Sequence, residues 1–382
     1  MLTILIFVLV LGVLVFVHEL GHFVVARMNG IKADEFGFGF PPRIGGVVKD
    51  DVTGRYRFVR GNTEVISPHT VYSLNWIPLG GFVRIKGEDR DSAQEPDSFA
   101  GRSAWTRIQV LGAGVVMNFL LAWLLFSVVL MIGFPEQVDP EKRESYATTS
   151  IQILQVQPHT PADEIGLKAG DVIQTLDAQP VTSLDFVSTY IREHRGEEIS
   201  VTVKRGGTAI TLTGTPRLNS PEGEGALGIS FSETAMVRYP WYQAIQLGFE
   251  QTYVKTTEIL SALGGMLVSL FTGAKTQMDI AGPVGIVSLT KQMSELGITY
   301  LLYFAAILSI NLGIINILPI PALDGGRILF VLIEKIKGSP VSTRVEGTIH
   351  QVGFILLILL MLLVTLNDIL QLSFWNRFSG WF

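Results

Sequence analysis

The stretch FVHELGHFVVAR, Phe16–Arg27, decides how this sequence folds, because it places ionisable side chains inside an apolar segment. Residues 1–17, MLTILIFVLVLGVLVFV, carry no charged side chain, and the apolar run continues to about Ala26. Roughly 25 residues at about 1.5 Å each are long enough to span a bilayer core. The run lacks the basic start and the small-residue cleavage pattern of a signal peptide. We therefore predict a retained transmembrane helix over residues 1–27.

The composition of the whole chain is that of a membrane protein. Of its 382 residues, 48% are hydrophobic and 16% are charged, whereas charged residues make up about a quarter of an ordinary soluble protein. The net charge of −5 gives no support for a nucleic-acid partner. The chain has no cysteine, which excludes disulfides and thiol chemistry and leaves the compartment open.

Further apolar segments are long enough, and nearly free enough of charge, to cross the membrane. They are residues 106–134, 299–326 and 351–373. The region 219–298 is predicted to hold a linker and one further helix. Because its stretch 242–271 contains Glu250, Lys255 and Glu258, we expect that helix to be amphipathic or interfacial.

Basic residues are concentrated near two of the loops, 28–105 and 327–350. They are Arg27, Lys32, Arg90, Arg102, Arg107, Arg327, Lys335, Lys337 and Arg344. Lys and Arg are enriched in short loops on the cytoplasmic side of membrane proteins. This bias predicts that both loops are cytoplasmic, and that both termini and residues 135–298 face outward.

A soluble domain is predicted over residues 145–218. The segments SIQILQV, ISVTVKR and AITLTGT alternate like strands around TPADEIGLKAGDVIQTLDAQPV. The Gly–Leu–x–x–Gly–Asp turn at Gly166–Asp171 resembles that of a circularly permuted bacterial PDZ domain. Such domains bind extended peptides or chain ends by adding a strand to a sheet edge. A generic small β-rich domain is the alternative.

The loop 28–105 contains strand-like segments of unusual composition. FGFGFPP, Phe36–Pro42, and PLGGFVRIKGED, Pro78–Asp89, are apolar and rich in glycine, and GRYRFVRGNTEVI between them is typical of a hairpin. We predict a β element at a membrane surface or in a cleft; an ordinary cytoplasmic hairpin is the alternative. The predicted fold is thus a polytopic α-helical membrane protein of about four transmembrane helices, with a membrane-associated β-hairpin region and one extracytoplasmic PDZ domain.

His18 and His22 have the spacing of a metal-binding pair. Residues four apart share one helix face, so both imidazoles can hold one ion. Glu19 can reach a metal-bound water, whose pKa zinc lowers to about 7, and take its proton. An ionisable group in a bilayer costs about 2.5–3.5 kcal/mol on insertion scales, and a metal would compensate this cost. Polar residues satisfied by other helices are the alternative.

A third ligand is expected, because catalytic zinc sites usually have three protein ligands. The stretch NILPIPALDGGR, Asn316–Arg327, follows the third apolar segment and contains Asp324. Its prolines stop a regular helix, and irregular backbone at membrane depth is tolerated only inside protein or along a wet cavity. We predict that Asp324 bends back towards the His pair; a helix-cap or turn role is the alternative.

HELGH together with NILPIPALDGG resembles the site-2 protease family of intramembrane zinc metalloproteases. The resemblance extends to FGFGFPP, PLGGFVRIKGED, the PDZ domain and AGPVGI, Ala281–Ile286, and covers most of the chain. The order of parts is similar to that of the bacterial sigma-E-regulating members. Those usually carry two tandem PDZ domains, whereas this chain has room for one, as some family members do.

The resemblance implies a role for each of these motifs. His18, His22 and Asp324 would bind Zn²⁺, Glu19 would be the general base, and Asn316 would help to hold the substrate. The Gly-x-x-x-Asn element of the family matches Gly114–Asn118. The residues implied to pair with an unwound substrate are Gly80, Gly81, Phe82 and Val83.

The implied activity is cleavage of the transmembrane segments of single-pass membrane proteins within the lipid bilayer. The substrate would be a pre-trimmed anti-sigma factor or a signal-peptide remnant, already cut by an upstream site-1 type protease, and the PDZ domain would gate its entry. The enzyme would lie in the bacterial cytoplasmic membrane, with its active site near the cytoplasmic side.

Other functions remain open from the residues alone. A catalytically silent scaffold would be expected to have an altered Glu19 or Asp324, and neither is altered. A metal transporter would show repeated halves with ligands in both, and we see no internal repeat. Zinc is inferred from the type of ligand, which does not exclude another divalent ion.

Overall fold

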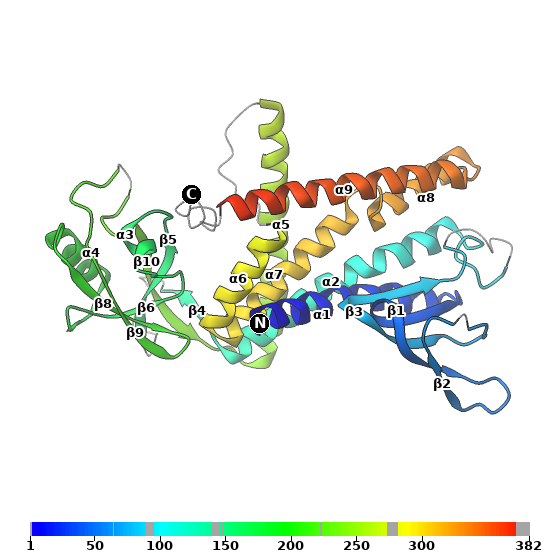
Figure 1. The fold of residues 1–382 in the computed structure, drawn as a ribbon, viewed down its shortest axis with the longest axis horizontal. Helices are drawn as coiled ribbons and strands as arrows, with labels where there is room; N and C mark the ends of the chain where they lie inside the picture. Colours follow the sequence, from blue (N-terminus) through cyan, green and yellow to red (C-terminus); the bar gives the residue numbers. More distant parts are fainter. Residues whose placement is uncertain are drawn as a thin grey trace, which may run out of the picture. The chain divides into compact units, whose positions relative to one another are not determined.

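The computed structural model describes residues 2–63, 65–88, 95–138, 146, 148–221, 224–272 and 282–371. The chain forms two compact units (Figure 1). The first, the helical unit, comprises Met1–Phe126, Ile245–Thr290 and Tyr303–Phe382. The second, the sheet unit, comprises Ser127–Ala244 and Lys291–Leu302.

Among the described residues, four helices are long and apolar enough to cross a membrane. They are α1 (Leu2–Met28), α2 (Ala104–Ile132), α7 (Ile298–Ile317) and α9 (Thr343–Gln371). The four predicted apolar helices are therefore confirmed. α9 begins before residue 351, because the polar segment TRVEGTIH continues the same helix without contributing to its apolar run.

The remaining longer helices are α5 (Trp241–Thr272), α6 (Pro283–Leu296) and α8 (Asp324–Lys337). α5 is not among the candidate spans and carries the exposed ion pair Lys255–Glu258. Its predicted interfacial position stays a prediction. Asp368 of α9 accepts the N–H groups of Gly282 and Gly285 at 3.1 and 2.8 Å, so a buried carboxylate caps the start of α6. The predicted AGPVGI motif overlaps this start, although its Ala281 lies outside the described residues.

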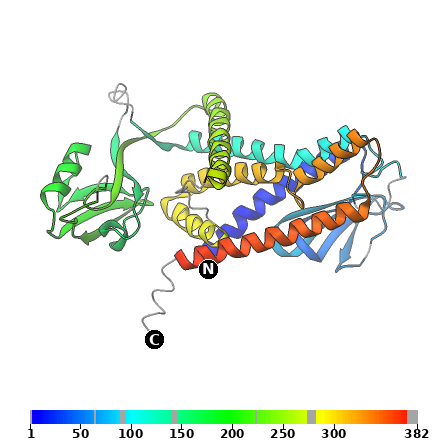
Figure 2. The same ribbon diagram turned by 90° about the horizontal axis from the view of Figure 1, so that it is seen from above.

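Small residues let the helices of the helical unit approach closely. A Cβ at Gly21 of α1 would lie 2.5 Å from the carbonyl oxygen of Ala113 in α2, which is the use of glycine expected between membrane helices. α7 runs beside α2 (Figure 2), where Ser309 Oγ donates to the carbonyl oxygen of Asn118 at 2.8 Å. The apolar core between these helices includes Ala122, Phe126, Ala306, Ile310 and Ile314. These contacts fix the faces of α1, α2 and α7 relative to one another.

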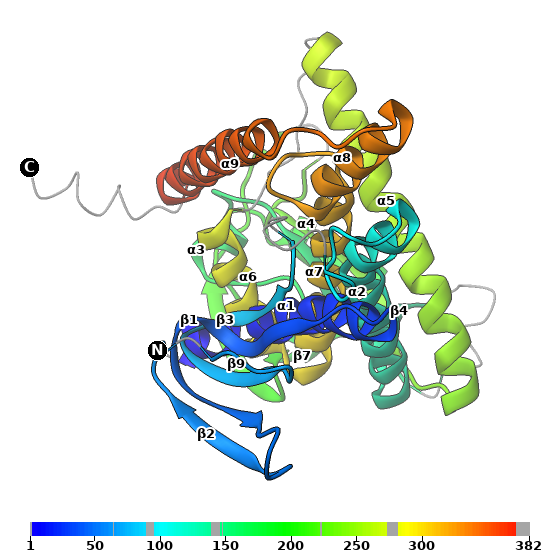
Figure 3. The same ribbon diagram turned by 90° about the vertical axis from the view of Figure 1, so that its right-hand side faces the viewer.

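A three-stranded sheet follows α1, in the order β2-β1-β3. Its strands are β1 (Ala33–Lys49), β2 (Tyr56–Arg60) and β3 (Val71–Ile85). Phe36 of β1 pairs with Val83 on one side and Tyr72 on the other, so residues 81–85 form an outer edge that no other described strand pairs with. This edge lies along α1 (Figure 3), and a Cβ at Gly80 would lie 2.5 Å from Val15. The segments Phe36–Pro42 and Pro78–Ile85 lie in β1 and β3 as expected. The predicted hairpin within Gly54–Ile66 is wrong, because among its described residues only β2 is a strand, and β2 pairs with the end of β1 instead. Association of the sheet with the membrane stays a prediction.

The sheet unit contains strands in the order β4-β10-β5-β6-β8-β9, with β7 beside β6. They are β4 (Phe134–Gln137), β5 (Thr149–Val156), β6 (Val172–Leu176), β7 (Gln179–Pro180), β8 (Ile199–Arg205), β9 (Thr208–Gly214) and β10 (Ile229–Val237). The unit also contains two short helices, α3 (Pro161–Glu164) and α4 (Leu184–Glu193). The core includes Ile151, Ile153, Leu176, Ile199, Val201, Val203 and Leu227. The predicted range 145–218 leaves out β10, which lies inside this sheet, and the PDZ assignment itself stays a prediction.

Candidate active site

His18 and His22 lie on one face of α1, and Asp324 is the first residue of α8. The two Nε2 atoms are 3.1 Å apart, and Oδ2 of Asp324 lies 3.0 Å from that of His18 and 3.3 Å from that of His22. Both imidazoles are buried. Among the described residues, these three form the group of side chains that can hold a metal ion. The structure thus brings together the residues that the sequence indicated, and their role as ligands stays a prediction.

The donor set has the composition and spacing that zinc requires. Ligand atoms about 2.0–2.1 Å from a tetrahedral ion lie about 3.3 Å from one another, which is close to the separations found here. Two imidazoles and one carboxylate would leave a fourth position for water or substrate. Gly114 of α2 keeps the space open, because a Cβ there would lie 2.5 Å from His22 Nε2 and 2.7 Å from His18 Cε1. The residues present therefore fit a zinc ion.

A second layer of contacts orients the two imidazoles. Nδ1–H of His22 donates to the carbonyl oxygen of Val110 at 2.8 Å, which leaves the lone pair on Nε2. Nδ1 of His18 lies 3.0 Å from the side-chain amide of Asn118, whose Oδ1 has no partner among the described residues. Exchanging the amide oxygen and nitrogen lets Oδ1 accept from His18 Nδ1–H. Both Nε2 lone pairs then face Asp324.

The backbone between α7 and α8 explains how Asp324 reaches the His pair. α7 ends at Ile317, and Pro319 and Pro321 prevent the helix from continuing. A Cβ at Gly325 would collide with the carbonyl oxygens of Ile317 and Leu318, and one at Gly326 would collide with that of Ile320. Glycine at these positions allows α8 to start directly against the end of α7. The chain therefore reverses within a few residues and presents the carboxylate of Asp324 inward.

Glu19 connects this group of side chains to the sheet. Its carboxylate interacts with His18, His22 and Asp324, and also with the backbone amide of Val83 in β3. Val83 belongs to the outer edge of the sheet, and Gly81, two residues earlier on the same edge, is packed against Phe16 of α1. The predicted base and the predicted substrate edge are therefore adjacent.

The other predicted substrate residue, Asn316, lies in the last turn of α7 and is half-buried. The side-chain amide of Asn316 makes no hydrogen bond with any described residue. Gly80, Gly81, Phe82 and Val83 lie together on β3. The structure places these residues near the end of α7 or along α1, and their contact with a substrate stays a prediction.

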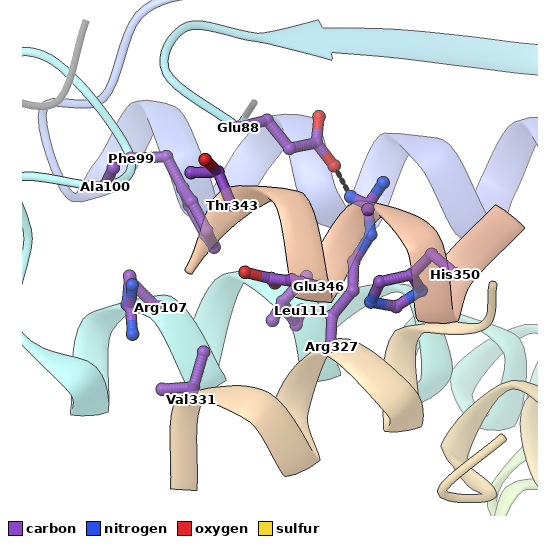
Figure 4. Close-up of a pocket in the computed structure, with 11 residues that line it drawn as sticks. Glu88, Phe99, Ala100, Arg107, Leu111, Arg327, Val331, Thr343, Glu346 and His350 are labelled. Carbon is purple, nitrogen blue, oxygen red and sulfur yellow. Dashed lines mark ion pairs between the residues drawn. The ribbon is translucent and has the colours of Figure 1, made fainter. Parts of the chain in front are cut away.

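A pocket of about 310 Å³ lies beside α8 in the helical unit (Figure 4). Arg327, one turn beyond Asp324, points into it and forms an ion pair with Glu88, at the end of the last turn after β3. On the opposite wall, Arg107 of α2 donates to Glu334 at 2.5 Å. The ion pairs tie α8 to both the sheet and α2, which fixes the helix that begins with Asp324.

Sequence reasoning missed several contacts of this site. The carbonyl of Val110 is a backbone group, so no side-chain pattern could identify it. Asn118 was named through its match to the Gly-x-x-x-Asn element of the family, but the sequence did not show that its partner is His18. The contact between His350 of α9 and the loop before Asp324 was also missed, because it depends on how two distant helices pack.

Comparisons with known proteins find similar sequences over nearly the whole chain. Residues 6–360 match the model of a family described as Peptidase family M50. A putative zinc metalloprotease of Clostridium perfringens is 34% identical, over 95% of this chain and 97% of the relative. The regulator of sigma-W protease RasP of Bacillus subtilis is 30% identical, over 97% and 99%. Among solved structures, the PDZ domain of an SdrC-like protein from Listeria monocytogenes covers 22% of this chain and 86% of its own, with 22% identity and a TM-score of 0.20.

Proposed function

This chain belongs to peptidase family M50, and we propose that it hydrolyses peptide bonds within the membrane-spanning segments of other membrane proteins. It is a zinc metalloprotease of the intramembrane site-2 type and a multi-pass membrane protein. The family, the enzyme class and the zinc cofactor that the sequence predicted are thereby confirmed. The substrate and the roles of individual residues belong to the proposal.

The zinc ion is proposed to be held by His18, His22 and Asp324. The observation that carries this assignment is the mutual separation of their donor atoms, 3.0–3.3 Å, beside Glu19. When bound, zinc would polarise the scissile carbonyl and lower the pKa of water to about 7. The Val110 carbonyl holds the ring of His22 in the orientation that this requires.

Glu19 is proposed to act as the general base and acid. It accepts a proton from the attacking water as oxygen bonds to the carbonyl carbon, and gives that proton to the leaving nitrogen as the carbon–nitrogen bond breaks. The backbone amide of Val83 lies against the same carboxylate. A substrate aligned on β3 would therefore have its carbonyl carbon near Glu19.

A transmembrane substrate hides its peptide groups in helical hydrogen bonds, so it must unwind before cleavage. No other described strand pairs with the outer edge of β3, residues 81–85, so this edge can add such a segment as a further strand beside the Val83 amide that lies against Glu19. Asn316 can both donate and accept hydrogen bonds to freed peptide groups. We propose that these two elements hold single-pass membrane proteins, for example an anti-sigma factor or a signal-peptide remnant.

The sheet unit is proposed to select substrates that have already been trimmed. A pocket of about 270 Å³ lies between α4 and the start of β10, with an apolar lining that includes Ile191, Leu227, Ile229 and Phe231. Backbone hydrogen bonds to β4 and Val138 begin at Glu233 of β10, so among the described residues the part of β10 before Glu233 has one open edge. Arg192 and Arg195 border the same pocket. These features suit the apolar C-terminal end of a peptide, such as an upstream site-1 type protease would leave.

The proposed location is the bacterial cytoplasmic membrane, with the sheet unit outside. The basic residues of the loops 28–105 and 327–350 support this orientation. His22 is followed closely by Arg27, at the cytoplasmic end of α1. The active site would then lie near the cytoplasmic side, where water can reach it.

The test compares the wild type with Glu19→Gln in detergent. Both are expected to bind about one zinc per chain, and only the wild type should cleave a model transmembrane substrate, since loss of a general base costs about 10²–10⁴-fold in rate. Glu258→Gln, on the exposed side of α5, is the matched control and should keep full activity. Cleavage by Glu19→Gln at the wild-type rate would refute the role of Glu19 as the general base. Absence of zinc from both proteins would favour a scaffold.

A further inference from the structure

The loop that precedes Asp324 contains a backbone conformation that needs support. Ala322 has a φ of 75°, in the left-handed region that residues other than glycine rarely adopt. Such a residue persists only where its surroundings hold it. It lies two residues before Asp324, so its backbone angles decide where that carboxylate points.

His350 of α9 supplies a direct hydrogen bond to this residue. The N–H of Ala322 donates to Nδ1 of His350 at 2.8 Å, across 28 residues of sequence. A backbone amide can only donate, so this nitrogen carries the lone pair. The ring lies against Phe330 of α8, with 5.3 Å between the ring centroids. His350 also borders the pocket beside Arg327 (Figure 4), so its ring is fixed between α8 and the loop.

α9 makes a second close contact with the same loop. Gly353, one helical turn after His350, faces Pro321, and a Cβ there would collide with the proline ring and lie 3.0 Å from its carbonyl oxygen. Two successive loop residues, Pro321 and Ala322, are therefore held by one face of α9. The sequence motif around Asp324 contains neither of the α9 residues.

We propose that His350 is a positioning residue for the zinc site, which holds Ala322 in its left-handed conformation and so directs Asp324 towards the His pair. This inference rests on the proposed role of Asp324 as a ligand. Without the hydrogen bond, Ala322 can return to an ordinary negative φ, and Asp324 turns away from His18 and His22. Groups that orient metal ligands in this way typically account for about 10–100-fold in metal affinity.

The experiment compares His350→Leu and His350→Asn in the full-length protein in detergent. Leu cannot accept a hydrogen bond, whereas the Oδ1 of Asn can replace Nδ1. Zinc affinity is measured by competition with a chelator, and amide hydrogen exchange of residues 318–326 is measured in zinc-free protein. We expect His350→Leu to lose about 10–100-fold in zinc affinity and to exchange the Ala322 amide faster. His350→Asn should stay close to the wild type in both.

Gln351→Leu is the matched control, since it adds the same side chain to the neighbouring, exposed position of α9. It should change neither quantity. Should His350→Leu not fold, Gly353→Ala replaces it, because the added methyl group pushes Pro321 and should also lower zinc affinity. Equal affinities for His350→Leu and the wild type, or equal losses for the Leu and Asn variants, would overturn the inference.

Asp324→Ala separates this inference from the proposed function. If Asp324→Ala loses zinc while His350→Leu keeps it, the ligand assignment stands and the positioning role is wrong. If Asp324→Ala binds zinc as tightly as the wild type, the ligand assignment is wrong and the positioning role falls with it.

Discussion

The proposed zinc site and the pocket between α4 and β10, called the groove below, differ in how their polar groups are held. On α1, polar side chains lie inside apolar helices, and each has a defined partner: Val110 for His22, Asn118 for His18. In the groove, the lining is largely apolar and the hydrogen-bonding groups are those of an open strand edge. A site of fixed partners should respond sharply to a single change, whereas an edge shared over several residues should respond weakly.

The largest effect is expected from Gly114→Ala. Its methyl group would lie 2.5 Å from Nε2 of His22, and this ring cannot move away without losing the hydrogen bond to Val110. We expect zinc affinity to fall by about 100-fold or more, because the change affects donor atoms as well as their orientation. Chelator competition measures it.

The matched control is Gly112→Ala on the same helix, where an added Cβ meets no atom within 4 Å. It should leave zinc affinity unchanged and stabilise the helix by up to about 1 kcal/mol. Equal zinc affinities for Gly114→Ala and Gly112→Ala would show that the space beside the His pair is not reserved for an ion.

Asn118 should give the next largest effect. Asn118→Leu removes the partner of His18 Nδ1 in a fully buried position, so zinc affinity should fall by about 10–100-fold. Asn118→Asp offers only acceptor oxygens, so it should keep the affinity if Oδ1 faces the ring. The ratio of the two affinities measures the effect. If Asn118→Leu binds zinc as tightly as the wild type, or if Asn118→Asp loses as much zinc affinity as Asn118→Leu, the amide oxygen of Asn118 does not face His18.

The sequence predicted the polar side chains of the proposed zinc site better than the backbone contacts around them. The i, i+4 spacing of His18 and His22 puts them on one face of a helix, and the prolines before Asp324 indicate that the preceding helix ends. Both are local properties of the sequence, so they could be predicted from it. The clearance at Gly114 and the Val110 carbonyl arise from packing between helices, which no local pattern encodes.

The sheet unit shows the same limit. The alternating segments of β5, β8 and β9 were recognisable, and together they indicated a β domain. β10 was left out, because it follows a Gly- and Pro-containing stretch and its place beside β5 depends on non-local pairing. Without β10 the groove could not be anticipated, since Ile229 and Phe231 belong to that strand.

A weaker effect is expected in the groove. Ile229→Lys places a charge in its apolar lining, so binding of a peptide with an apolar free C-terminus should weaken by about 10-fold. Fluorescence anisotropy with the full-length protein measures it, and cleavage of untrimmed substrates should rise. Thr213→Lys, on an exposed position of β9, is the control and should change neither. Unchanged peptide binding in Ile229→Lys would remove the groove from the selection step.

The smallest effect on zinc affinity is expected from Asp368, a second buried acid in an apolar helix. Like Asp324 it is a largely buried carboxylate, but it accepts the amides of Gly282 and Gly285 at the start of α6. Asp368→Asn removes the negative charge favoured at a helix N-terminus and should cost about 1 kcal/mol of stability. Zinc affinity should stay at the wild-type value, whereas Asp324→Asn should lose zinc. Thermal unfolding and chelator competition together distinguish the two acids, because a loss of zinc in Asp368→Asn would mean that the α6 cap also supports the metal site.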